Sequence, residues 1–302
     1  MCPRRCGANR YRAAGACGEG AEVRVAKVML HRWEEPCISG SDGHRGSGAV
    51  FFSGCPLRCV FCQNRDISRG GAGETVSPER LAEIFEKLEA AGAYNINLVS
   101  PTQFACQITK ALDLYRPTVP VVFNTGGYER GEAIRALKGY ADIYLTDFKY
   151  GTNSVGAKYS ACPDYTDAAL PALRAMVETV GTPVFSGGGM LRSGVIVRHL
   201  VLPGQRHDSL KVLEKIADAV GTKNIILSLM SQYTPDFAPP DMPEIRRRVT
   251  TFEYESVRSA ALEMGFEGYS QDASSSDCRY TPDFSRAAGG REHSDIENGR
   301  IS

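Results

Sequence analysis

From residue 48 onward, the chain alternates between short apolar runs and longer segments in which apolar residues recur every three or four positions. The short runs predict β-strands and the longer segments predict amphipathic helices. Such alternation is typical of a parallel sheet wrapped by crossover helices, so the pattern predicts an α/β fold of six strand–helix units. The predicted strands cover 49–53, 95–99, 119–124, 142–149, 194–202 and 224–230, and the predicted helices cover 77–91, 100–115, 130–139, 165–180, 207–220 and 251–264.

Two of these helices have a recognisable start signal. Ser77-Pro78-Glu79 places a capping serine before a proline and an acidic residue. Ser100-Pro101-Thr102 has serine and proline in the same order. A serine side chain can accept a hydrogen bond from a backbone N–H of the first helical turn. Proline is tolerated in that turn because the N–H groups there have no partner within the helix, so a residue without an N–H loses no hydrogen bond. We therefore expect one helix to begin at each of these serines.

The two ends of the chain differ from the middle. Residues 1–46 are rich in Gly, Arg and Cys, with one short apolar run at 23–30 that predicts a strand. Residues 285–302 are polar, contain no apolar periodicity and are expected to be disordered. The sequence therefore predicts a Cys-rich N-terminal extension (1–46), a core domain (47–284) and a disordered tail (285–302).

The net charge and the apolar content of the chain disfavour two classes of protein, those that bind nucleic acid and those that span a membrane. The 302 residues contain 35 Lys and Arg and 35 Asp and Glu, so the formal net charge is zero and disfavours a polyanion partner such as nucleic acid. No apolar run is long enough to cross a membrane, and the N-terminus lacks the apolar segment of a secretory signal. Seven of the ten cysteines precede Asn64, which favours metal binding in a reducing compartment over disulfides. We expect a cytoplasmic protein without membrane contact.

The most specific motif is a group of three cysteines directly after the first predicted strand. Cys55, Cys59 and Cys62 have the spacing C-x3-C-x2-C, with an aromatic residue before the last. Four thiolates normally hold an iron–sulfur cluster, so three would leave one iron of a four-iron cluster open. The alternative, a zinc site with three protein ligands or a fourth from elsewhere, stays open on these residues alone.

Every predicted strand ends in polar or glycine-rich residues. In barrels of parallel strands, reactive side chains come from the carboxyl ends of the strands and the loops that follow. We therefore expect these residues to line one face with the cysteines. The alternative for Asp147 and Lys149, a structural ion pair, is less favoured. The candidate residues are Ser100, Thr102, Asn124, Asp147, Lys149, Arg198 and Gln232.

Most of the chain resembles a known family. From residue 46 to 284 it is similar to the radical S-adenosylmethionine (radical SAM) proteins related to pyruvate formate-lyase activating enzyme, in particular an uncharacterised bacterial and archaeal branch. The residues that carry the resemblance are 48–64, which contain the three cysteines, 124–129, 142–150, 198–204 and 230–233.

The resemblance implies a partial (β/α)6 barrel of the TIM type and a radical reaction. Cys55, Cys59 and Cys62 would hold a [4Fe–4S] cluster whose open iron binds S-adenosylmethionine (SAM). A reductant such as flavodoxin or ferredoxin would supply the electron that cleaves SAM to a 5′-deoxyadenosyl radical. Asp147 and Lys149 match a segment that contacts SAM in the activating enzyme. The target would be the glycine of a partner protein or a small molecule, and the sequence does not choose between the two.

Two parts of the sequence depart from the family pattern. Where the family has a Gly-Gly-Glu segment that receives the amino group of SAM, this chain has Ser100-Pro101-Thr102. Either Gln232 or Tyr233 stands near the position of a family histidine. Cys2, Cys6 and Cys17 suggest a second metal, with Cys37 as a further candidate ligand.

The alternative to catalysis is a zinc protein or an electron-transfer iron–sulfur protein.

Overall fold

The computed structural model describes residues 2–40 and 45–270 of the chain. The predicted tail, 285–302, lies outside the described residues. The boundaries between the three predicted segments are not tested by the fold, and they stay predictions.

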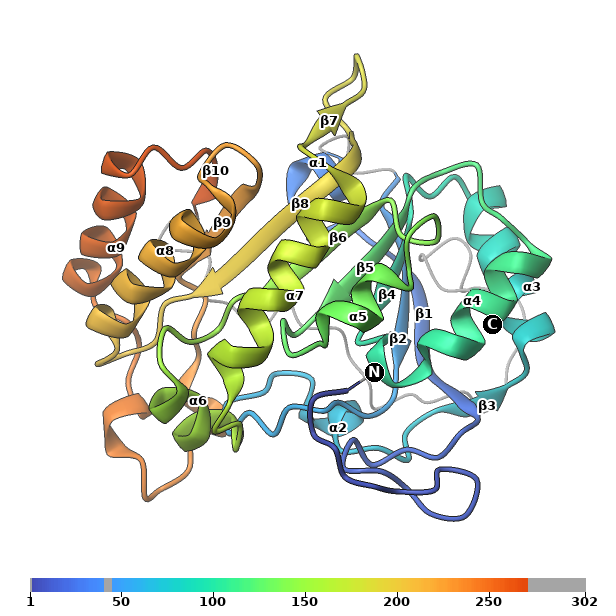
Figure 1. Cartoon of the computed structure of the whole chain (residues 1–302), viewed down its shortest axis with the longest axis horizontal. Helices are drawn as coiled ribbons and strands as arrows, with labels where there is room; N and C mark the ends of the chain where they lie inside the picture. The colour runs from blue at the N-terminus through green and yellow to red at the C-terminus, as the bar shows by residue number, and fades with distance from the viewer. Residues whose placement is uncertain (1, 41–44, 271–302) are drawn as a thin grey trace.

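A single sheet runs through the described part of the molecule (Figure 1). Seven of its strands are parallel, in the order β10-β9-β8-β6-β5-β4-β2, and β1 and β3 extend it antiparallel beyond β2. The short β7 pairs only with β8. The strands are β1 (Val23–His31), β2 (Ser47–Phe52), β3 (Glu74–Val76), β4 (Ile96–Val99), β5 (Val121–Thr125), β6 (Ile143–Asp147), β7 (Val184–Phe185), β8 (Leu191–Leu200), β9 (Ile226–Met230) and β10 (Gly268–Ser270).

The strands that the sequence predicted are neighbours in chain order. β2, β4, β5, β6, β8 and β9 each pair in parallel with the next, as successive strand–helix units require. Within the described residues the last strand does not pair back onto the first, so the sheet stays open. The prediction of a partial, TIM-type barrel of six units is confirmed.

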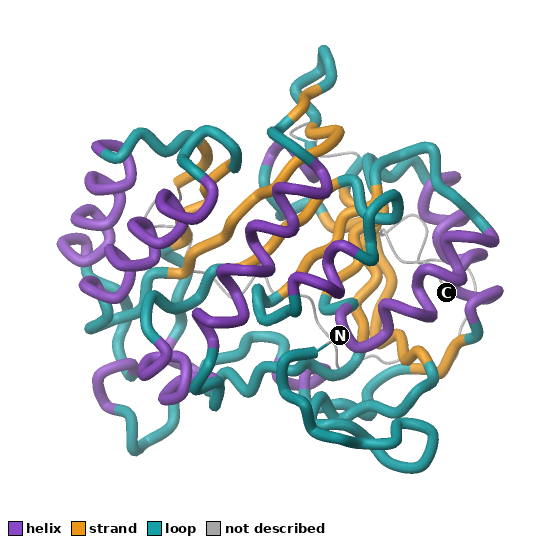
Figure 2. The backbone as a smooth tube through the Cα atoms, in the orientation of Figure 1, coloured by secondary structure: helices purple, strands orange, loops and turns teal. Residues whose placement is uncertain are grey.

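The longer helices follow the strands and cover one side of the sheet (Figure 2). Neighbours in this layer pack in the pairs α3 with α4, α5 with α7, α7 with α8, and α8 with α9. The helices are α1 (Pro36–Ser39), α2 (Arg65–Ser68), α3 (Pro78–Ala90), α4 (Ala105–Leu114), α5 (Gly131–Arg135), α6 (Asn153–Ser160), α7 (Tyr165–Val180), α8 (Arg206–Val220) and α9 (Thr251–Glu263), with 3-10 turns at Thr102–Phe104, Pro235–Phe237 and Pro243–Ile245.

Local sequence explains where the best-defined helices begin. The side chain of Ser77 accepts a hydrogen bond from the backbone N–H of Arg80, 3.2 Å away, as its position before Pro78 predicts. In α9, Thr250 and Glu253 form a reciprocal capping box. These bonds satisfy backbone donors that would otherwise lack partners at the helix start.

The second predicted cap is wrong. Ser100 makes no capping bond: it has a left-handed backbone with φ of +57°, and a 3-10 turn separates it from α4. The chain leaves β4 by reversing direction at Ser100, so the serine serves the turn rather than the helix. The predicted helix 130–139 is also shorter, because α5 ends at Arg135.

The core confirms that the parallel strands are covered on both sides. All six residues of β2 are buried, and the inner residues of β5, β6 and β8 are buried as well. The apolar face of α3, with Leu81, Phe85 and Leu88, packs into the same core. This packing holds the strands in place, so the residues at their carboxyl ends have fixed positions.

Residues 2–22 contain no helix or strand and are held to the core by hydrogen bonds. Arg10 donates to the backbone of Gln103, and the backbone N–H of Cys55 donates to Cys17 O, 3.2 Å away. The predicted strand at 23–30 is confirmed as β1, which pairs along β2. The N-terminal segment therefore lies against the loop that carries the three cysteines.

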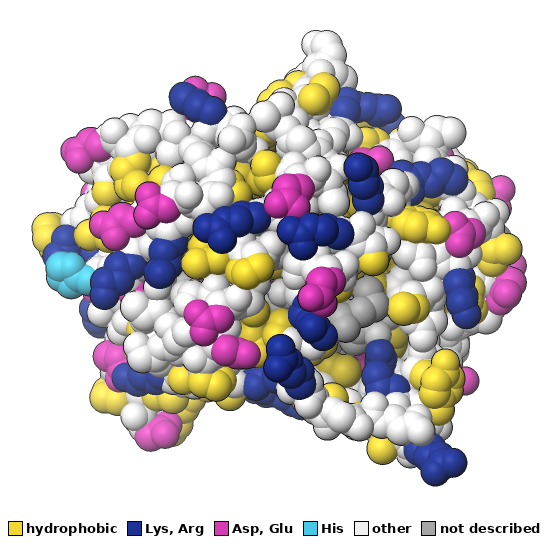
Figure 3. All heavy atoms as spheres, in the orientation of Figure 1, with side chains coloured by type: hydrophobic (Ala, Val, Ile, Leu, Met, Phe, Trp, Pro, Cys, Tyr) yellow, Lys and Arg dark blue, Asp and Glu magenta, His cyan; other side chains and the backbone are white. Residues whose placement is uncertain are grey.

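Acidic and basic side chains are interspersed over the face of the molecule shown in Figure 3, as expected for a chain of zero formal charge. Among the described residues, no helix combines the length and apolar character needed to cross a membrane.

Candidate functional site

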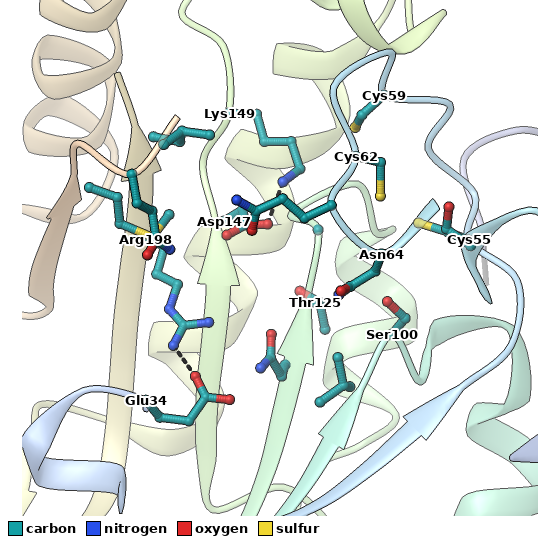
Figure 4. A pocket seen from close by; sticks show the side chains of 18 of the residues that line it. Glu34, Cys55, Cys59, Cys62, Asn64, Ser100, Thr125, Asp147, Lys149 and Arg198 are labelled. Atoms are coloured by element: carbon teal, nitrogen blue, oxygen red, sulfur yellow. Dashed lines mark hydrogen bonds and ion pairs between the residues drawn. The ribbon is translucent and has the colours of Figure 1, made fainter. Parts of the chain in front are cut away.

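A cavity of about 470 Å³ lies at the carboxyl ends of the central strands. Its walls come from the loop after β2, from the ends of β4, β5, β6, β8 and β9, and from the segment between β1 and α1 (Figure 4). Its lining includes nearly every residue that the sequence predicted, namely Cys55, Cys59, Cys62, Ser100, Asn124, Asp147, Lys149, Arg198 and Gln232.

The three cysteines reach the cavity because of the turn at Gly54. This glycine has a φ of +79°, and a Cβ there would come within 2.7 Å of the carbonyl oxygen of Cys17. Only glycine fits this position without strain. The turn directs the following loop across the strand ends, and all three thiols are free. Figure 4 shows them at one side of the cavity.

The thiols lie in a setting with little water. Burial raises the pKa of Cys55 and of Cys62, so both are protonated at neutral pH when no metal is bound. The side chain of Ser160 donates a hydrogen bond to the sulfur of Cys59, 2.9 Å away, and the hydroxyl of Tyr150 contacts Ser160. Because a bound metal stabilises thiolates, binding at this loop would release protons.

The donor set fits an iron–sulfur cluster better than a single ion. Across residues 2–40 and 45–270, no three His, Cys, Asp or Glu side chains converge on a point where one metal ion could sit. A cluster does not need such convergence, because each thiolate binds a different iron. Cys55, Cys59 and Cys62 thus place three separate thiols around one space, and their role as ligands of a [4Fe–4S] cluster stays a prediction.

Asp147 ends β6, and Lys149 follows two residues later. Their side chains form an ion pair that lines the cavity, with the lysine nitrogen directed at the Asp147 carboxylate in Figure 4. Burial alone would lower the pKa of Lys149, but the carboxylate of Asp147 raises it above its usual value, so the lysine is charged. A carboxylate and an ammonium therefore stand beside the three thiols.

The other predicted contacts divide into two groups. Ser100, Asn124 and Gln232 line the cavity, and the left-handed backbone of Ser100 lies at its wall. Thr102 is buried outside the lining, where its hydroxyl donates to Glu129 at 2.9 Å. The spacing of residues in the sequence does not show that Ser100 lines the cavity and Thr102 does not, because the turn at Ser100 determines which side chain faces the cavity.

Arg198 also lines the cavity, but its guanidinium is already paired. It donates to Glu35 at 2.7 Å from Nε and 2.6 Å from Nη2, and it pairs with Glu34 as well. Both carboxylates are almost fully buried, with 7 % and 6 % of their side chains exposed. These two glutamates line the cavity, and sequence analysis did not identify them.

Glu129 is a second residue that sequence analysis missed. It is buried behind the cavity wall and accepts hydrogen bonds from Thr102 and Thr125. Burial raises its pKa to about 7. The only signal in the sequence is the acidic residue five positions beyond Asn124, which does not reveal burial.

The second set of cysteines lies outside the cavity. Cys2, Cys6 and Cys17 are half-buried, exposed and buried respectively, and none of them lines it. A Cβ on Gly15 would lie 3.5 Å from the sulfurs of both Cys6 and Cys17, so these two thiols flank one glycine. Cys37 is buried in α1 and packs with core residues such as Ile38. A second metal therefore stays a prediction.

Comparison with known proteins places this site in a family. Residues 49–210 match the family model of the radical SAM superfamily. An uncharacterised protein of Methanocaldococcus jannaschii is 32 % identical over 283 residues, which cover 90 % of this chain and 75 % of that protein.

Solved structures are more distant. A radical SAM methyltransferase from Sphaerobacter thermophilus aligns with 76 % of this chain and 69 % of its own, at 13 % identity and a TM-score of 0.47. An HPPK-DHPS structure from Plasmodium falciparum aligns with 69 % of this chain and 44 % of its own, at 10 % identity and a TM-score of 0.30. The family model matches more than half of the chain, and the archaeal relative extends over most of it. The chain belongs to the radical SAM superfamily.

Proposed function

We propose that the cavity is the active site of a radical SAM oxidoreductase in which Cys55, Cys59 and Cys62 hold a [4Fe–4S] cluster. The superfamily implies this cluster, SAM and a reductant. The observation that carries the proposal is that three thiols from one loop and the Asp147–Lys149 pair line the same cavity. When bound and reduced, the cluster supplies one electron to SAM, which yields methionine and a 5′-deoxyadenosyl radical for hydrogen abstraction.

The polar residues beside the thiols would bind and orient SAM. A carboxylate such as Asp147 accepts hydrogen bonds from an ammonium group or from ribose hydroxyls, and the ammonium of Lys149 can pair with a carboxylate. Ser100, Asn124 and Gln232 offer further hydrogen-bonding groups on the same wall. Zwitterionic SAM carries each of these complementary groups.

The molecule that loses hydrogen belongs to one of two classes. The first candidate is a small molecule, because the cavity extends beyond the thiols and the Asp147–Lys149 pair to further charged side chains, those of Glu34, Glu35 and Arg198. A glycine of a partner protein is the second candidate, because the resemblance to activating enzymes implies it. Flavodoxin or ferredoxin is the proposed reductant in either case.

Anaerobic reconstitution tests the proposal. The protein is loaded with iron and sulfide, reduced with dithionite and incubated with SAM, and we expect it to release 5′-deoxyadenosine. Replacing Cys55, Cys59 or Cys62 with alanine should remove the visible cluster absorbance and the product together. Cys106→Ser is the matched control, because Cys106 is an exposed cysteine of α4 outside the cavity.

Metal analysis of the same samples distinguishes the enzyme from the non-catalytic alternative, a zinc protein or an electron-transfer iron–sulfur protein. An intact cluster that never cleaves SAM would refute the enzyme and leave an electron-transfer protein. Stoichiometric zinc without visible absorbance after anaerobic purification would identify a zinc protein. A radical located on glycine by electron paramagnetic resonance, after mixing with a partner protein, would select the second class of target.

A further inference from the structure

The part of the cavity away from the thiols is lined by charged side chains that the proposed cluster chemistry does not use. We call His31, Glu34, Glu35 and Arg198 the acidic end; all four line the cavity. Figure 4 shows Glu34 and Arg198 well separated from the three thiols, with Asp147 between them in this view. One cavity therefore has two chemically different ends.

The acidic end carries an excess of negative charge. Glu34 and Glu35 share the single guanidinium of Arg198. Burial opposes ionisation of Glu34, but Arg198 lowers its pKa below the usual value, so it stays ionised. Burial lowers the pKa of His31, which leaves its imidazole neutral at pH 7. The two carboxylates and the guanidinium together carry a net charge of −1. Lys27 of β1, which does not line the cavity, also lowers the pKa of His31.

Two buried atoms in the same region lack a hydrogen-bond partner among the described residues. They are Nδ1 of His31 and Oδ1 of Asn97. His31 is 8 % exposed and lines the cavity, and Asn97 donates from Nδ2 to Oε1 of Glu34 at 2.9 Å. Carboxylates, an amide oxygen and a neutral imidazole nitrogen are all groups that accept hydrogen bonds. The region is therefore rich in acceptors as well as negatively charged.

A purely structural role would not explain this composition. One carboxylate would neutralise Arg198 and tie the segment between β1 and α1 to β8. A second buried carboxylate adds a desolvation cost that the hydrogen bond from Asn97 and the shared guanidinium offset in part, and that a further positive group would offset more fully. Trp33 and Tyr269 also line the cavity, and aromatic rings favour cations beside them. The missing group is a cation that donates N–H bonds.

We propose that the acidic end binds a positively charged nitrogen group, an alkylammonium or alkylguanidinium, of a small organic molecule. This molecule is the substrate if the proposed function holds, and the inference rests on that function only to this extent. Its charged group would neutralise the second carboxylate, and its N–H donors would meet the acceptors that now lack partners. Its carbon chain would extend toward the thiol end.

Calorimetry on the reconstituted protein tests this assignment without turnover. Binding of four probes is measured anaerobically with SAM present and no reductant: butylamine, butylguanidine, neutral butyramide and anionic pentanoate. We expect at least one of the two cations to bind at least tenfold more tightly than butyramide. Equal binding of butyramide or pentanoate, or no binding of either cation, overturns the proposal.

A variant series locates the binding. Glu34→Gln keeps the shape of the side chain and should weaken cation binding at least tenfold. Glu132→Gln, at an exposed position outside the cavity, should leave it within twofold. An unchanged cation affinity in Glu34→Gln overturns the proposal. A loss of SAM affinity as large as the loss of cation affinity also overturns it, because the acidic end would then belong to SAM.

A second variant and one control measurement complete the test. If Glu34→Gln does not fold, His31→Leu removes the unpartnered nitrogen and keeps all three charged groups, and unchanged cation affinity there overturns the proposal. SAM binding to the wild type is measured separately. A wild type that binds cations but never cleaves SAM would refute the proposed function and leave the cation site standing.

Discussion

The two ends of the cavity are built in opposite ways. The thiol end comes from one loop, since Cys55 and Cys62 are only seven positions apart. The acidic end joins Glu35 to Arg198, which are 163 positions apart. Reactive residues that lie close together in the chain can be recognised from the sequence. A cluster of charged residues that are far apart in the chain becomes visible only in the fold.

The two ends also differ in what they contribute to stability. Buried, neutral thiols need no charge partner, so they can be replaced at modest cost when no metal is bound. The acidic end contains ionised groups that depend on one another, and removing one leaves buried charge. We therefore expect substitutions at the thiol end to affect chemistry and substitutions at the acidic end to affect folding as well.

The largest expected effect is at Arg198. Arg198→Met leaves Glu34 and Glu35 buried without a cation, which should lower the free energy of unfolding by about 3–5 kcal/mol. Denaturant unfolding of the metal-free protein measures it. Arg135→Met is the matched control, because Arg135 pairs with Glu178 on the surface with about half of each side chain exposed; its loss should stay below about 1 kcal/mol. Equal losses would contradict the contrast between the ends.

The next effect is a pH dependence that originates at Glu129, behind the wall between the two ends. Its pKa is raised to about 7 in the folded protein, so the folded state keeps a proton that the unfolded state loses near pH 4.5. Stability should therefore fall as the pH rises from about 4.5 to 7, by about 3 kcal/mol from this group. Glu129→Gln should remove that contribution.

Thermal or denaturant unfolding at several pH values checks this difference between wild type and variant. Glu132→Gln, three positions away and exposed, should keep the wild-type profile. Parallel pH profiles for the wild type and Glu129→Gln would show that Glu129 ionises normally in the folded protein.

A smaller effect is expected at Lys149, on SAM rather than on folding. Lys149→Met removes the ammonium proposed to pair with the SAM carboxylate, a charged hydrogen bond of about 1.5–3 kcal/mol, so SAM affinity should fall roughly ten- to hundredfold. Equilibrium binding to the reconstituted protein measures it. Lys158→Met, at a half-exposed lysine paired with Glu244, serves as control. Unchanged SAM affinity would instead favour a structural ion pair with Asp147.

The smallest effect is expected at Ser160. Ser160→Ala removes the hydrogen bond to the sulfur of Cys59. It should lower the reduction potential of the cluster, because hydrogen bonds to the sulfurs stabilise the reduced state, and cost about 1 kcal/mol of stability. A redox titration followed by electron paramagnetic resonance detects the shift, with the exposed Ser154→Ala as control. A potential equal to the wild type would mean that Ser160 does not tune the cluster.

Sequence reasoning succeeded where local patterns determine structure. The period of apolar residues located the strands and the longer helices, and α7 covers the same residues, 165–180, that were predicted. The cysteine spacing and the polar ends of the strands predicted most of the cavity lining. These features depend on residues close together in the chain, so a sequence displays them directly.

The failures share a physical cause. The predicted helices did not include the stretch 153–160, which forms α6; this helix contains a glycine and has no side-chain cap. Ser100 was taken as a cap, but the turn after β4 requires a left-handed residue there. Glu34 and Glu35 were not identified, because nothing in the local sequence shows that β8 brings Arg198 to them. In each case tertiary packing overrode the local preference.

The separation of Glu35 from Arg198 has a consequence for how the protein is made. At about 5–20 residues per second, the ribosome adds the arginine roughly 10–30 s after the glutamates. The cysteine loop emerges early in that interval, before Tyr150, Ser160 and β8 exist to cover it. The three thiols are therefore synthesised several seconds before the residues that bury them, and closure of the wall around them is a late event.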